Sequence, residues 1–184
     1  MILNFSQKVF KLYNIIAQIF GILGASSLIF SFQQKKSKNF FLFQTLGSGL
    51  FLINYLMLGA YTGALISIMS VTRSALVPFV NRKSSYFIFP LLLIIPLIIS
   101  FYIYTGIETI LMMIAYLVFT IAMFTKNSKI IRITQFVCAS PFQLIHNAMV
   151  SSVGGIICEA FNMISIIVSI KRLGLKNFEP SQKN

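Results

Sequence analysis

The chain has 184 residues, of which 57% are apolar and only 10% are charged. A soluble domain of this size needs a polar surface that this composition does not supply, so an ordinary soluble enzyme or binding domain is excluded. The formal net charge of +12 does not indicate a nucleic-acid partner. Its basic residues fall in short connections between apolar runs, where such residues act as orientation signals.

Seven apolar runs predict an all-α polytopic membrane protein, because each run approaches the roughly 20 residues that a helix needs to cross a bilayer. The lipid bilayer is therefore the first expected partner. In chain order the predicted transmembrane helices are Tyr13–Phe32, Phe40–Leu58, Thr62–Val80, Tyr86–Tyr102, Ile107–Thr125, Ile131–Val150 and Gly154–Ile170.

Two kinds of connection alternate between these runs. Basic connections are 33–39, 81–85 and 126–130, whereas uncharged ones are 59–61, 103–106 and 151–153. With seven spans, all basic connections and the C-terminal tail lie on one side. That side carries 12 of the 15 lysines and arginines, the exceptions being Lys8, Lys11 and Arg73. The positive-inside rule then predicts an outer N-terminus and a cytoplasmic C-terminus.

The layout predicts an internal duplication within a single transmembrane domain. Residues 13–80 and 107–170 each contain three spans joined first by a basic and then by a tight connection. Residues 86–102 form a linker helix, and 171–184 form a cytoplasmic tail. Matched pairs such as Ser48 and Ser140 lie 92 residues apart. Because corresponding helices are four spans apart, the two triplets run in the same direction, as a 3+1+3 parallel repeat.

Polar side chains inside spans indicate where a site lies, because such groups are costly in lipid and usually face the bundle interior. Glu159 lies early in the seventh span and His146 late in the sixth, so the tight turn between the spans places both at similar depth. The pair is interpreted either as a solute or proton site or as a static contact that joins two helices.

The matched triplets extend this candidate site. Asn162 lies one helical turn from Glu159 and matches Ser70, while His146 matches Asn54. Arg73 has two interpretations, as a counter-charge for Glu159 or an anionic solute, and as a side chain that snorkels to the headgroups. The predicted solute-binding set is Asn54, Ser70, Arg73, His146, Asn147, Glu159 and Asn162.

The corresponding regions around Pro141 and Gly47 are candidate helix kinks, interpreted either as hinges or as relief of packing strain. The sequence has no glycine-rich phosphate loop, no Cys/His metal cluster and no recognisable nucleophile–base–acid arrangement. We therefore expect no catalytic residues, no metal and no cofactor, and we do not expect an enzyme.

Two strings of residues resemble the YgjV-type bacterial inner membrane proteins. One is the run 58–64 (Leu-Gly-Ala-Tyr-Thr-Gly-Ala) leading to Arg73, and the other is Ile145-His146-Asn147 followed by Gly154-Gly155, Glu159 and Asn162. The resemblance covers most of the chain, from the first span to Lys171-Arg172. It implies a multi-pass protein of the bacterial inner membrane, with the N-terminus in the periplasm.

The predicted layout is also similar to that of the SWEET and PQ-loop transporters, which move sugars, amino acids or vitamins. In SWEET-type carriers, polar residues on the third helix of each repeat hold the solute, and Ser70 and Asn162 fall there. The proline–glutamine signature is met only by Pro141-Phe142-Gln143, because the first triplet has no proline at this place.

These observations favour a SWEET-like carrier of a small polar solute. The competing hypothesis is a non-transporting membrane scaffold, in which the polar residues only pair helices and the basic face contacts anionic lipid or a partner. A third and weaker hypothesis, an intramembrane hydrolase, requires a nucleophile bonded to His146.

Overall fold

The structure, a computed structural model, describes residues 2–59, 61–102, 104, 106–149 and 153–174. Within these ranges only the backbone is described at 2–11, 61, 62, 82, 108, 147 and 153–155. The regular structure of the described residues is helical, which confirms the all-α prediction.

The helices follow the apolar runs of the sequence closely. In chain order they are α1 (Ile2–Phe32), α2 (Ser37–Met57), α3 (Tyr61–Leu76), a 3-10 turn η1 (Val77–Phe79), α4 (Arg82–Tyr102), α5 (Ile107–Phe124), α6 (Ser128–Thr134), a π-helical segment η2 (Gln135–Ala139), α7 (Ser140–Met149) and α8 (Val153–Leu173). Because α6, η2 and α7 continue without a break, the described chain forms seven helical segments, and each overlaps one predicted span.

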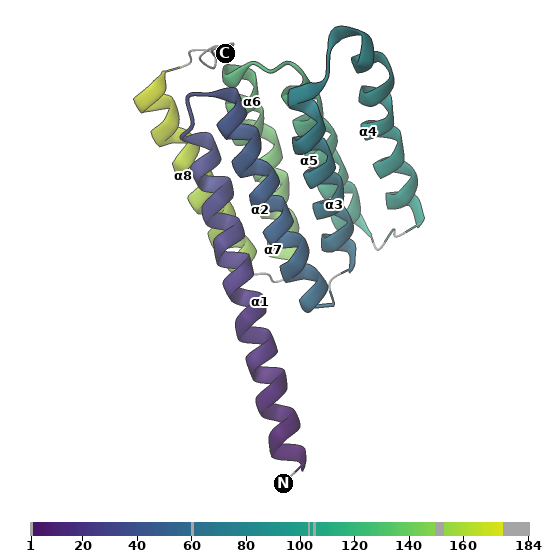
Figure 1. The fold of residues 1–184 in the computed structure, drawn as a ribbon, viewed down its shortest axis with the longest axis vertical. Helices are drawn as coiled ribbons and strands as arrows, with labels where there is room; N and C mark the ends of the chain where they lie inside the picture. The colour runs from purple at the N-terminus through teal and green to yellow at the C-terminus, as the bar shows by residue number, and fades with distance from the viewer. Residues whose placement is uncertain (1, 60, 103, 105, 150–152, 175–184) are drawn as a thin grey trace.

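Three of these helices are long and apolar enough to cross a membrane by themselves, over Leu12–Phe32, Ser37–Met57 and Lys83–Tyr102. Shorter apolar helices cover Gly63–Phe79 and Thr109–Phe124. With 31 residues, α1 is about 46 Å long at 1.5 Å per residue, compared with a hydrocarbon core of about 30 Å. Its N-terminal part accordingly projects beyond the other helices (Figure 1).

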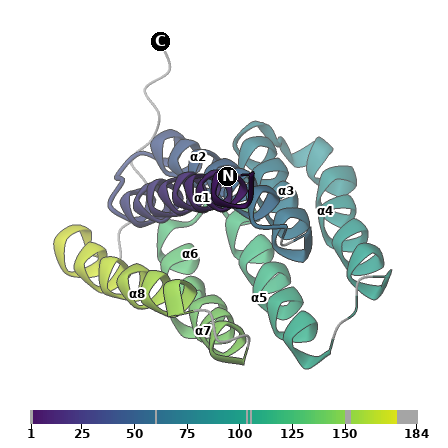
Figure 2. The same cartoon turned by 90° about the horizontal axis from the view of Figure 1, so that it is seen from below.

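The helices form two layers with α4 at one edge (Figure 2). One layer holds α1, α2 and α3, and the other holds α8, the α6–α7 segment and α5. In both layers the helix that is second in chain order packs between the other two. The layers also meet directly, because α1 packs against α8.

Buried apolar side chains concentrate at the end of the bundle where α1 ends and α2 begins. The cluster comprises Phe32, Phe40, Phe41, Val77, Ala115, Phe119, Met123, Ile131, Ala139 and Ile166. Phe40 makes edge-to-face contacts with Phe32 and Phe41, with ring centroids 5.7 and 5.2 Å apart. Close packing of this kind drives helix association in a membrane, where lipid tails are as apolar as the side chains themselves. This end of the bundle is therefore its most firmly packed part.

Gly47 sets the spacing of α1 and α2 and does not mark a kink. The helix α2 runs unbroken through this position. A Cβ atom on Gly47 would lie 2.7 Å from a methyl carbon of Leu28 and 3.0 Å from the carbonyl oxygen of Gly24. Small residues at such crossings let two backbones approach closely. The two interpretations of Gly47 in the sequence both assumed a kink, whereas the structure shows a glycine that permits the close approach of α1 and α2.

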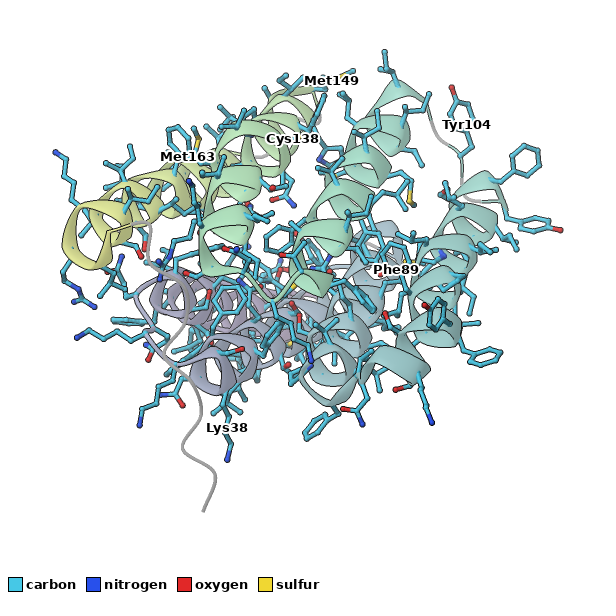
Figure 3. The ribbon with its side chains drawn as sticks, turned by 90° about the horizontal axis from the view of Figure 1, so that it is seen from above. Lys38, Phe89, Tyr104, Cys138, Met149 and Met163 are labelled. Carbon is cyan, nitrogen blue, oxygen red and sulfur yellow. The ribbon has the colours of Figure 1, made fainter. Side chains whose placement is uncertain are left out.

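Of the three long apolar helices, α4 is the least buried within the bundle. It contacts α3 and α5, and Phe89 packs edge-to-face on Phe124 with ring centroids 4.8 Å apart (Figure 3). Its two ends carry exposed aromatic side chains, Tyr86 and Phe87 at the start and Phe101 and Tyr102 at the end. Aromatic residues are enriched at both membrane–water interfaces, so this distribution fits a helix that crosses the bilayer at the edge of the bundle.

Candidate solute site

A cluster of polar side chains joins α8 to the α6–α7 segment near the middle of the bundle. Asn162 donates from Nδ2 to Oε2 of Glu159 at 3.5 Å, and the hydroxyl of Ser140 lies near the same carboxylate. Ser140 also accepts a hydrogen bond from Nε2 of Gln135 at 2.9 Å. Except for Glu159, which is partly buried, all these residues are buried. The four side chains form one contiguous polar group, which we call the Glu159 cluster.

The π-helical segment η2 positions this cluster. The backbone N–H of Ser140 bonds to the carbonyl of Gln135, five residues earlier, and the side chains of the same two residues also bond to each other. Pro141 follows directly and has no N–H to donate, so a regular α-helix would lose a bond at this turn. The wider register accommodates proline, and π-helical turns occur frequently at functional sites. The predicted irregularity at Pro141 is thus a π-helical turn beside the candidate site.

The other layer contributes Tyr55 of α2, which lies close enough to Cys158 and Glu159 to interact electrostatically with both. Its ring stacks on Phe51, with centroids 5.8 Å apart. The ring also covers Gly63 of α3, where a Cβ atom would lie 2.9 Å from ring carbons. Tyr55 thus places a phenol of the first layer within electrostatic range of Glu159.

Asn162 is incompletely paired. The residue is 5% exposed and its Oδ1 is buried, with no hydrogen-bond partner among the described residues. Leaving a buried acceptor unsatisfied costs about 1–3 kcal/mol. A group that served only to hold two helices together would normally have a partner. The unused oxygen lies on the residue that already donates to Glu159, so an acceptor and a carboxylate adjoin each other.

Asn54, a predicted member of the site, lies elsewhere. Its Nδ2 donates to the carbonyl of Ala17 at 2.6 Å, which ties α2 to α1. The amide also packs on Gly21, where a Cβ atom would lie 3.1 Å from Nδ2. Asn54 is therefore a contact between helices of one layer, and the structure does not bring it together with Glu159 and Asn162.

Arg73 points from α3 to α5 and is only 4% exposed. Its Nη1 donates to Oγ1 of Thr120 at 3.0 Å and to the carbonyl of Tyr116 at 3.4 Å. The guanidinium also lies over the rings of Tyr116 and Phe119, with its central carbon 4.8 and 5.0 Å from the two centroids. Arginine is suited to such combined hydrogen-bonding and stacking. Arg73 thus lies in the last turn of α3 and joins it to α5, and its roles as a counter-charge, as an anchor for an anionic solute and as a snorkelling side chain stay predictions.

For the remaining predicted residues the structure gives burial but fewer contacts. Ser70 is partly buried near the middle of α3, and His146 is partly buried on α7. The side chain of Asn147 lies outside the described residues. Asn162 donates a hydrogen bond to Glu159, and the proposed pairing of His146 with Glu159 stays a prediction.

Sequence reasoning missed Gln135 and Ser140 as members of the cluster. A signal for them exists in the sequence, because polar residues recur at Gln44 and Gln135 and at Ser48 and Ser140 within otherwise apolar helices. Each of these side chains is buried. In the first layer the equivalent glutamine bonds to Ser31, with Nε2 of Gln44 2.8 Å from the hydroxyl. The glutamines that recur at Gln44 and Gln135 are therefore a sequence signal for the members of the Glu159 cluster.

The Glu159 cluster has the chemistry of a hydrogen-bonding site. Within the described part of the chain, no three His, Cys, Asp or Glu side chains gather as a metal site would require. The cluster offers a carboxylate, an amide carbonyl and a hydroxyl, which together accept hydrogen bonds from a polar molecule or take up a proton.

The fold and the apolar helices define a multi-pass α-helical membrane protein. Residues 15–177 match the family Imp-YgjV, described as a bacterial inner membrane protein, and the chain belongs to that family. No curated protein and no solved structure is similar enough to count as a match. The expected location in the bacterial inner membrane is thereby confirmed.

Proposed function

We propose that the protein is a carrier, and not an enzyme, that moves a small polar solute across the bacterial inner membrane. The observation that carries this proposal is the buried Glu159 cluster with the unpartnered Oδ1 of Asn162. Carrier sites lie near the middle of the membrane, at the interface between repeated halves. Glu159 is near Tyr55 of the opposite layer, which fits such a position.

The solute class follows from the groups that are available. The carboxylate of Glu159 and Oδ1 of Asn162 both accept hydrogen bonds, so a suitable solute presents several donors. An amine or a compound rich in hydroxyl groups meets this requirement, whereas a carboxylate or phosphate would be repelled by Glu159. In the first layer Ser70 occupies the position that corresponds to Asn162, and it belongs to the proposed site on that basis.

A carrier of this kind is proposed to have seven spans in a 3+1+3 parallel repeat. Three pairs of buried residues lie 92 positions apart in α3–η1 and α8, namely Arg73 and Ser165, Ser74 and Ile166, and Val77 and Ser169. In Figure 1 both α3 and α8 run toward the end of the bundle where the C-terminus lies. These three pairs, toward the ends of two helices of the same direction, are buried alike, which supports a parallel duplication.

The contacts between the layers support the same duplication. Arg73 on the third helix of the first triplet bonds to α5, the first helix of the second triplet. Conversely, Ser165 on the third helix of the second triplet donates to the carbonyl of Ile29 on α1, at 2.9 Å. Ser165 also accepts a bond from Nε2 of Gln33 at 2.9 Å. Two equivalent positions thus join the triplets reciprocally, as an axis along the membrane normal requires.

The orientation is proposed to be periplasmic for the N-terminus and cytoplasmic for the C-terminus. The basic residues Lys35, Lys36, Lys83, Lys126 and Lys171 are exposed, and each lies in or beside a connection or terminus at one end of the bundle (Figure 1). Basic residues in short loops favour the cytoplasmic side. The site would then open alternately to the two sides, with the π-helical turn before Pro141 as the flexible point of the α6–α7 segment.

A non-transporting scaffold is the second candidate, and specific contacts favour it. Asn54 and Arg73 are buried and make hydrogen bonds to neighbouring helices, as polar residues that only hold a bundle together do. Under this hypothesis the Glu159 cluster is a further contact of the same kind. The two hypotheses differ in what they require of Asn162, since only the carrier needs its free acceptor.

A ligand screen with matched asparagine variants tests the proposal. Purified protein in detergent is heated with panels of polyamines, amino acids, sugars and nucleosides, since a ligand that binds the folded state raises the unfolding temperature. We expect a ligand that stabilises the wild type and Asn54→Leu but neither Asn162→Leu nor Glu159→Gln. That ligand should also be taken up by proteoliposomes of the wild type. Equal stabilisation of all four proteins would place binding elsewhere and argue against the proposed site.

A further inference from the structure

A basic cleft lies at the end of the bundle opposite to the projecting part of α1. It has a volume of about 450 Å³ and is lined by Phe30, Gln33, Gln34, Lys35, Lys36, Asn39 and Arg172. These residues come from the end of α1, the connection that follows it, the start of α2 and the end of α8. Because α1 and α2 are long and apolar enough to span the membrane, the short connection between them lies at the level of the lipid headgroups.

The chemistry of the cleft is that of an anion site. Lys35, Lys36 and Arg172 supply three positive charges, and the other polar lining residues are amides. The whole chain has only three acidic residues, and no carboxylate of the described residues lines the cleft. Among the described residues, these cations therefore have no carboxylate beside them in the cleft.

The start of α2 adds to this charge. Lys36 is the N-cap residue and its side chain makes no capping hydrogen bond. The first backbone N–H groups of a helix have no partner within the helix and carry a partial positive charge, which favours an anion. Both Lys36 and Asn39, from the first turn of α2, line the cleft, so this helix end adjoins the three cations.

Arg172 and Phe30 indicate which anion fits. Arg172 is held in place, because its Nη2 donates to the carbonyl of Gln33 at 2.9 Å, and its other guanidinium nitrogens can still bind oxygens. Phe30 provides an apolar wall and is 58% exposed. A free inorganic anion gains nothing from an exposed aromatic ring at membrane depth, whereas a phospholipid places its acyl chain there.

We infer that this cleft binds the phosphate of an anionic phospholipid, with Lys35, Lys36 and Arg172 around the headgroup and Phe30 beside the acyl chain. The lipid would bridge α1, α2 and α8, and thus the two layers of the bundle. Basic residues at the membrane surface attract anionic headgroups, and basic pockets between transmembrane helices are known to bind them. The inference does not depend on whether the protein transports a solute.

Native mass spectrometry of the full chain, titrated with phosphatidylglycerol or phosphatidylcholine of equal acyl chains, tests the inference. We expect the first phosphatidylglycerol to bind the wild type at about tenfold lower concentration than phosphatidylcholine. The triple variant K35Q/K36Q/R172Q should lose this preference. The double variant K35Q/K36Q keeps the bond between Arg172 and Gln33, and it should lose most of the preference if the triple variant does not fold.

The matched control is K38Q/K83Q/K129Q, which removes the same charge from the same end of the bundle. All three lysines are exposed and lie outside the cleft lining, and Lys38 points away from the bundle (Figure 3). This control should keep the preference within about twofold. An equal loss in the control would reduce the inference to diffuse attraction by a basic surface. Displacement of phosphatidylglycerol by millimolar inorganic phosphate would assign the cleft to a free anion, and no preference in the wild type would overturn the site.

Discussion

Asn54 and Asn162 are the same residue type, and each is 5% exposed, yet the interfaces around them differ. Asn54 sits between α1 and α2, where its amide bonds to a backbone carbonyl at 2.6 Å. Asn162 sits beside the π-helical turn, where its amide reaches Glu159 only at 3.5 Å and its carbonyl oxygen has no partner among the described residues.

The difference separates two uses of polar groups in a membrane protein. An amide that bonds to a neighbouring helix stabilises the contact of the two helices, and such bonds in a membrane contribute roughly 0.6 kcal/mol on average and up to about 1.7 kcal/mol. A buried amide oxygen without a partner costs stability, and beside a carboxylate it is available to bind a solute. Four substitutions test this contrast, and they follow from the largest expected effect on stability to the smallest.

Arg73→Ala should cause the largest loss, about 3 kcal/mol, because it removes two hydrogen bonds from a buried charged group and its contacts with two rings. For a chain of this length, this corresponds to a fall in the unfolding temperature of roughly 6–12 °C. Scanning fluorimetry in detergent measures it. Arg73→Lys should be intermediate, since lysine keeps the charge but loses the planar fork. A neutral outcome would show that Arg73 does not hold α3 to α5.

Gly47→Ala should cost about 2 kcal/mol, because the new methyl group would press on Leu28 and on the backbone of Gly24. This substitution loosens the interface between α1 and α2, in which Asn54 makes its hydrogen bond. Gly49→Ala is the control, since its Cβ would lie 4.0 Å from a methyl carbon of Val71, an ordinary van der Waals contact. The control should be neutral or slightly stabilising, because alanine is a better helix former than glycine. Similar losses in both variants would refute the close-packing explanation.

Asn54→Leu should cost about 1 kcal/mol, the typical value of one hydrogen bond, with no effect on ligand binding or uptake. The same unfolding assay measures the first quantity, and ligand-induced shifts in melting temperature measure the second. If this variant lost ligand stabilisation while remaining folded, Asn54 would belong to the solute site after all, and the contrast with Asn162 would disappear.

Asn162→Leu should change the unfolding free energy by less than about 0.5 kcal/mol, and it should abolish ligand stabilisation and uptake. Leucine removes a buried acceptor that lacks a partner, and this gain offsets the loss of a long bond to Glu159. A drop in stability as large as that of Asn54→Leu would mean that Asn162 acts as a helix contact. The scaffold hypothesis would then be favoured.

Much of the fold was predictable from the sequence, because apolar runs and charged connections determine where helices lie in a membrane. The predicted run Ile107–Thr125, for example, corresponds to α5 at Ile107–Phe124. The sequence predicted less well which side of each helix faces its neighbours. Sequence matching grouped Asn54 with His146. It gave no information on the side of α2 from which Asn54 projects. In the structure that side faces Ala17 of α1.

The candidate site was predictable in its acidic residue and in Asn162, and less so in its surroundings. A carboxylate inside an apolar helix is conspicuous by its cost, whereas Gln135 and Ser140 become neighbours through a π-helical turn that changes the register by one residue. The basic cleft was also missed, because it depends on Arg172 at the end of α8 lying beside the connection of α1 and α2. Both features arise from contacts between helices distant in sequence or from irregular backbone.

The peripheral position of α4 has a consequence for the direction in which the helices after it run. Each of the other helices belongs to one of the two layers, whereas α4 lies at their common edge and contacts only α3 and α5 among the main packing partners. A triplet of helices ends with the chain travelling in the direction in which it began, so a directly joined second triplet would start in reverse. One additional helix restores the direction. In the proposed 3+1+3 arrangement, α4 would return the chain to the end of the bundle at which the second triplet begins, in addition to its contacts with α3 and α5.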